Sequence, residues 1–242
     1  MKKRFNLKKL NNSGSTIVTV IVVITFVTIL ATTILYLSGM NYFMKATDRK
    51  AKENFYNAEV CLEEVKAGLV ELAAEAADRA YLNTMVKYAV DDSFSRYAEF
   101  QDEYFIALEE VWNEAAYDSS GTLNTHLWAL KNMVEDEYKS DLSFVGISSD
   151  GSNEADFGKL DKSSINSGHV YIRDIKLSYT DASGYYTEIT TDFDFIVPEM
   201  NWAITESLSN TTSVSDAGTE KPDVRKEYDI AEFVNYSNWQ KQ

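Results

Sequence analysis

The chain has 242 residues, enough for one sizeable domain with appendages or for two domains. Its 23 basic and 38 acidic residues give a formal charge of -15, and such a surface repels phosphate backbones, which argues against nucleic-acid binding. The single cysteine, Cys61, excludes an internal disulfide, so the folded part must be stabilised by packing. Because free cysteines behave as small apolar side chains, we expect Cys61 to be buried in a helix.

The N-terminal region joins a basic leader to an apolar run. Residues 1–14 contain basic residues and no acidic ones, and residues 17–37 are an unbroken apolar segment. A helix of that length spans about 31 Å, close to the hydrocarbon thickness of a bilayer. We therefore predict a membrane-spanning helix over residues 15–44, in a single-pass cell-membrane protein with a cytoplasmic N-terminus and an extracellular C-terminal part.

Threonines punctuate the apolar run. At 100° per residue, Thr25, Thr28 and Thr32 fall on one side of the helix. This side is a candidate packing stripe against neighbouring membrane helices. Alternatively, each hydroxyl bonds a carbonyl one turn back in its own helix.

Residues 45–140 read as an extracytoplasmic helical region. Apolar residues recur from Ala51 to Ala76 at alternating steps of four and three, and no proline occurs before Pro198. The stripe either packs on the chain's own domain, which we favour, or pairs with the helix of another chain. Helical spacing continues to about Ala116, and a further helix is expected over Leu123–Tyr138, after a loop at residues 118–121.

Residues 141–198 read as an antiparallel β region. A hairpin is expected from Val170–Thr180 and Tyr186–Val197, with one face buried and the other, which carries Asp192, acidic and wet. The polar segment 148–168 lacks EF-hand spacing and is interpreted as a solvated loop. Residues 199–226 suggest a Ser/Thr-rich linker or loop, and residues 227–242 a C-terminal segment that docks back as a strand or short helix.

The N-terminal segment resembles the class III signal of type IV pilins and type II secretion pseudopilins. The shared features are the short basic leader, Gly14, and an apolar helix that starts at Ser15. The segment Ala51–Leu69 is similar to a helix segment of PilX-like minor pilins, with Phe55, Ala58, Glu59 and Leu62 at its landmark positions. The hairpin is also similar to the sheet of PilX-like proteins from Gram-positive bacteria. The resemblance covers about the first quarter of the chain most clearly.

What the resemblance implies is a structural role. Prepilin peptidase would cut between Gly14 and Ser15, and the α+β, pilin-like subunit would assemble into, initiate or cap a type IV pilus-like filament. Its partners would be other pilin subunits, the peptidase and membrane lipid. Major subunits of the family usually have Phe and Glu at the first and fifth mature positions, where this chain has Ser15 and Thr19. That departure argues against a major pilin and is familiar in minor subunits.

Two other functions fit the same segments. A single-pass signal-anchor protein would present a binding domain outside the cell without joining a filament. A sensor subunit is disfavoured because fourteen cytoplasmic residues cannot hold an output domain. Catalysis is not expected, since His126 and His169 lie far apart and neither has a metal-ligand partner at suitable spacing. We therefore expect no enzyme activity, cofactor or metal.

Overall fold

The computed structural model describes residues 13–90, 93, 95–146, 158–199 and 229–241. The described chain is α+β, with a long N-terminal apolar helix and a small antiparallel sheet. It divides into two compact units, Met1–Lys50 and Ala51–Gln242, which are considered separately below. The second unit is called the head here.

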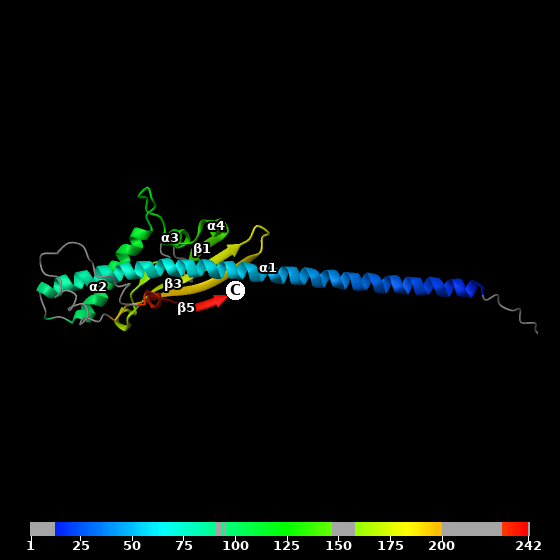
Figure 1. Cartoon of the computed structure of the whole chain (residues 1–242), viewed down its shortest axis with the longest axis horizontal. Coiled ribbons are helices and arrows are strands. Elements are labelled where there is room, and N and C mark those ends of the chain that lie inside the picture. Colours follow the sequence, from blue (N-terminus) through cyan, green and yellow to red (C-terminus); the bar gives the residue numbers. More distant parts are fainter. Residues whose placement is uncertain (1–12, 91–92, 94, 147–157, 200–228, 242) are drawn as a thin grey trace, which may run out of the picture. The chain divides into compact units, whose positions relative to one another are not determined.

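Helix α1 spans Ser13–Val90 and is shared by both units (Figure 1). In the first unit, every large apolar side chain between Ile17 and Met44 is exposed. This segment is rich in Val, Ile and Thr, which lose side-chain freedom in a helix and favour strands in water. A helix built from them satisfies all its backbone groups within one segment, as a lipid environment demands.

In the head, α1 buries the predicted apolar stripe against its own domain. Ala58, Leu62, Val65 and Leu69 are at most 2% exposed and share one core with the sheet. The alternative in which this stripe pairs with another chain is therefore wrong. Gly68 does not interrupt the helix, and a Cβ at that position would lie 2.9 Å from Met133 Cγ and Sδ. Cys61 is fully buried in this core, as expected.

Small residues let α1 approach its neighbours closely. Five alanines between residues 73 and 80 are fully buried: Ala73, Ala74, Ala76, Ala77 and Ala80. Helix α2 (Arg96–Ala115) lies beside this part of α1 and contributes Phe100, Tyr104, Leu108 and Trp112 to the buried set (Figure 1). The continuous helical pattern up to Ala116 is thus two helices, since α1 ends at Val90.

The helix predicted over Leu123–Tyr138 is also interrupted. The structure has α3 (His126–Asn132) and α4 (Asp136–Lys139) instead. Thr125 starts α3 by accepting the Trp128 N–H at 3.2 Å, and Leu123 instead forms a bridge with Tyr117. The apolar spacing remained helical across this segment, but the N-cap fixes where the helix begins.

The sheet has strands β1 (Leu142–Gly146), β2 (Leu160–Asp161), β3 (His169–Thr180), β4 (Tyr186–Ile196) and β5 (Val234–Lys241). They pair antiparallel in the order β1-β3-β4-β5, and β2 also pairs with β3. The short helices η2 (Ile165–Ser167) and η4 (Ile230–Phe233) precede β3 and β5. The segment predicted to dock back therefore supplies both a short helix and the last strand. The predicted linker and the acidic part of segment 148–168 lie outside the described residues, apart from Glu199.

The β3–β4 hairpin has the predicted turn. Asp181 accepts the backbone N–H groups of Ser183 and Tyr185, and Gly184 takes a φ of 82° that favours glycine. The face predicted to be acidic and wet is different, because Asp192 is only 5% exposed. Register shifts in β3 and β5 fold backbone and side-chain donors over its carboxylate.

Candidate functional site

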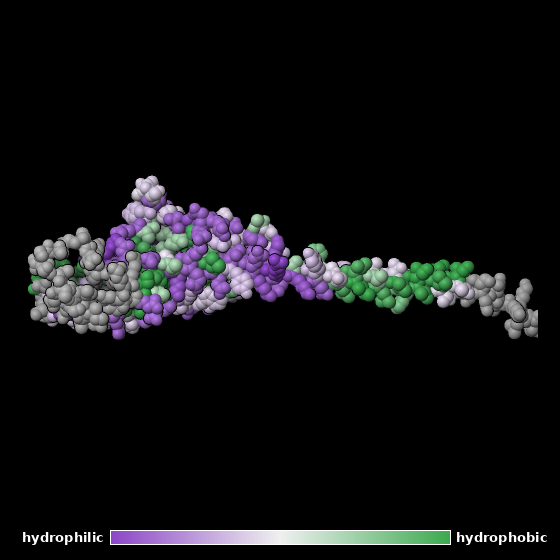
Figure 2. Space-filling view, viewed as in Figure 1, coloured by the Kyte–Doolittle hydropathy of each residue, from purple (hydrophilic) through white to green (hydrophobic). Residues whose placement is uncertain are grey.

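The exposed apolar part of α1 is the first candidate site. Among the described residues, α1 is the helix long and apolar enough to cross a membrane, and none of its most apolar window is buried. Figure 2 shows apolar residues over the visible face of this segment and mostly hydrophilic residues over the visible head. By length and composition this segment can serve as a membrane anchor or as a signal sequence.

The three threonines of the predicted stripe bond within their own helix. Thr25, Thr28 and Thr32 each donate a hydroxyl at 2.8 Å to the carbonyl four residues earlier. This is the local alternative to interhelical bonding, and it lowers the polarity of the segment. Packing of this stripe against another membrane helix stays a prediction.

The predicted cleavage bond, Gly14–Ser15, lies in the first turn of α1. Residues 1–12 of the basic leader are outside the described part. Cleavage by a prepilin peptidase therefore remains a prediction.

The pilin-like motif places three residues in packing positions and one at the surface. Ala58 and Leu62 are buried, and the Phe55 ring meets the Trp239 ring edge-on at 6.2 Å. Glu59 is half-buried on the outer side of α1. Burial, together with the charges of nearby glutamates that include Glu59, raises the pKa of Tyr236 on β5. The motif thus fixes α1 on the sheet and leaves one carboxylate at its border.

Sequence reasoning missed a polar residue that aligns α1 with the hairpin. Asn54 is 2% exposed and donates from Nδ2 to the Tyr185 carbonyl at 2.7 Å. A signal was present, because Asn54 stands four residues before Ala58 on the apolar stripe. A buried amide needs a partner, so this contact sets where the β3–β4 turn meets the helix.

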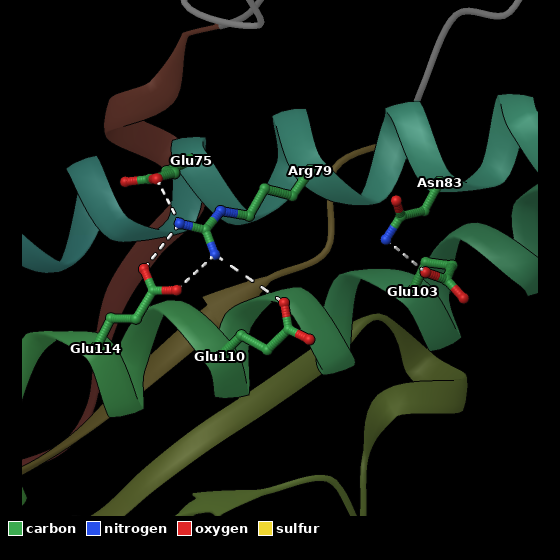
Figure 3. A network of polar contacts seen from close by, with 6 residues as sticks. All are labelled: Glu75, Arg79, Asn83, Glu103, Glu110 and Glu114. Atoms are coloured by element: carbon green, nitrogen blue, oxygen red, sulfur yellow. Dashed lines mark hydrogen bonds and ion pairs between the residues drawn. The ribbon is translucent and has the colours of Figure 1, made fainter.

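A charged network joins α1 to α2 on the other side of the head (Figure 3). The Arg79 guanidinium binds both carboxylate oxygens of Glu114, at 3.0 and 2.8 Å, and also Glu75 at 2.8 Å. Hydrogen bonding to Arg79 holds the pKa of Glu114 below its usual range. Lys87 bonds Glu99 and Glu103 in the same interface. These pairs run in opposite chain directions and fix the antiparallel register of the two helices.

The groups that could carry chemistry are held in structural contacts. Burial raises the pKa of the Cys61 thiol to about 12, so the thiol stays protonated at neutral pH. His126 stacks on Trp112 with centroids 5.2 Å apart, and His169 bonds Asp194 at 2.9 Å. Within the described ranges, no group of three or more His, Cys, Asp or Glu residues could hold a metal ion.

No protein-family model, curated protein or solved structure matches this chain. Any assignment of function therefore depends on the residues and contacts described above.

Proposed function

We propose that the chain is a PilX-like minor pilin or pseudopilin, a structural subunit of a type IV pilus-like filament. The observation that carries this proposal is that one helix, α1, supplies both an exposed apolar segment and the core helix of an α+β head. The apolar segment suits storage in a membrane, and the head suits display outside it. The basic leader before Gly14 supports the same proposal.

The proposed mechanism requires two environments for the same helix. Prepilin peptidase cuts between Gly14 and Ser15, and the apolar segment then anchors the subunit in the cell membrane. During assembly the segment leaves the lipid and packs among the helices of other subunits, so its apolar side chains stay out of water in both states. Thr19 stands where major subunits have a membrane-buried Glu, which suits a minor subunit.

The second candidate is a signal-anchor protein that presents the head as an extracellular binding domain. It is favoured by Ser15 and Thr19, which depart from the usual start of a mature pilin. It needs neither cleavage nor contact with other pilins, so the two candidates differ in a measurable way.

Surface shearing separates the two candidates. Cells with an active prepilin peptidase should release the protein with sheared filaments, and cells without the peptidase should retain it in the membrane. A Gly14→Val variant should also stay in the membrane. Release that persists in both cases, or retention in peptidase-positive cells that make filaments, would favour the anchor.

A further inference from the structure

The outer side of α1 carries a strip of apolar residues that the head leaves uncovered. Tyr56 and Val60 are 60% and 43% exposed, and Ala67 is also exposed. At 100° per residue these three residues fall within about 40° of one another. They line an open groove together with Glu59, Glu63 and Glu64.

The glutamates flank this strip on both sides. Glu59 and Glu63 lie on the side of β5, where their charges act on Tyr236. Glu64 lies on the opposite side, where its Oε2 accepts the Glu135 N–H before α4 at 2.9 Å. Lys66 reaches over the Tyr236 ring, with Nζ 5.3 Å from its centroid, outside the strip. A partner for this surface must therefore bring an apolar centre with cations on both flanks.

The same helix carries a segment with that complementary pattern. Tyr42 and Ala46 are exposed, with Lys45 and Arg49 on one flank and Lys50 on the other. Residues 45–52 hold four basic residues and one acidic residue, whereas residues 53–75 hold six acidic residues and one basic residue. Each charge of the basic set lies 14 positions before a glutamate of the acidic set: 45 and 59, 49 and 63, 50 and 64.

We propose that the strip Tyr56–Ala67 of one subunit docks the segment Tyr42–Lys50 of a second copy, with the two α1 helices parallel and shifted by 14 residues. When two parallel helices face each other, the left flank of one meets the right flank of the other. Arg49 therefore meets Glu64, and Lys50 meets Glu63, around a centre in which Ala46 faces Val60. This docking rests on the proposed function and names the partner of the same helix as another copy.

Two consequences follow from the shift. Each copy uses a different surface at its two ends, so the contact is head-to-tail and generates an open assembly. A shift of 14 helical residues corresponds to about 21 Å, which two copies anchored at equal depth in one bilayer cannot adopt. The contact should therefore form only after one copy has moved outward, and the subunit should adjoin its own kind within the filament.

Disulfide trapping tests this register in the full chain, in cells. In a Cys61→Ala background, the Ala46→Cys/Val60→Cys variant should give disulfide-linked dimers or longer species in the sheared filament fraction and none in the membrane fraction. Each single-cysteine variant should remain monomeric. Dimers from either single variant would indicate unshifted packing and overturn the proposal, and so would filaments that contain the double variant without cross-links.

Charge reversal supplies an independent arm. In the two-cysteine background, Arg49→Glu should lower the cross-linked fraction roughly fivefold, and Glu64→Arg should restore it. Lys52→Glu makes the same change of charge away from the docking face and should have little effect. Equal losses from Arg49→Glu and Lys52→Glu, without rescue, would overturn the pairing. An uncleaved protein absent from filaments would instead refute the proposed function, and the docking would fail with it.

Discussion

Asp192 should be among the most sensitive polar residues of the head. Its Oδ1 accepts the backbone N–H of Asp174 at 2.7 Å, and its Oδ2 accepts the Asn238 side chain at 2.6 Å. Asp174 and Asn238 have positive φ angles of 56° and 53°, so one carboxylate holds two irregular backbone positions on strands that flank β4. Asp192→Ala leaves both donors without this acceptor. Hydrogen bonds to a charged group contribute about 1.5–3 kcal/mol each and are not additive, so we expect a loss of about 3 kcal/mol.

The loss can be measured by denaturant unfolding of the full chain in detergent, followed by tryptophan fluorescence. All four tryptophans lie within residues 51–242, so the signal reports the head. Asp192→Asn keeps an acceptor for Asp174, and rotation of the Asn238 amide can restore the second bond, so this variant should lose much less. Glu188→Ala, which breaks an exposed ion pair with Lys176, should cost under about 1 kcal/mol. Equal stability of Asp192→Ala and Glu188→Ala would refute this account of the sheet.

Three further predictions concern the head. Leu69→Ala, at a fully buried position of α1, should lower the free energy of unfolding by about 2–5 kcal/mol, and a loss below 1 kcal/mol would mean that the helix is not packed as described. Arg79→Met should cost about 1 kcal/mol in low salt and less in high salt, and a salt-independent loss would contradict its ion-pairing role. Burial, with the charge of Lys159, lowers the pKa of His126 in the folded state, so the unfolded chain takes up the proton first and stability should decline as pH falls below about 6.5. His126→Gln should remove that part of the decline, measured as unfolding midpoints between pH 7.5 and 5, and an unchanged profile would contradict it.

Periodic patterns predicted the main elements because their cause is local. The four-and-three spacing from Ala51 to Ala76 identified the core side of α1, and alternation identified both strands of the hairpin. The turn at residues 181–184 was readable because Asp and Gly there have specific conformational roles. The burial of Cys61 followed from general thiol behaviour.

The remaining features depend on contacts that are distant in sequence. Asp192 was assigned to the wet face because alternation alone cannot anticipate a bulge that brings Asn238 over it. The partner of Asn54 lies 131 residues away, so its role needed the fold. The end of α1 at Val90 and the start of α3 at His126 depend on turns and caps within otherwise helical spacing. The threonine bonds were one of two stated alternatives, and periodicity could not choose between them.

The mature N-terminus tests the central claim most directly. Mass spectrometry of the protein from native membranes should find a chain that starts at Ser15, with a methylated amine if it is handled like other pilins. The leader before Gly14 should be absent from this form. A chain that still starts at Met1 or Lys2, in cells whose prepilin peptidase is active, would contradict the filament proposal and leave a membrane-anchored head.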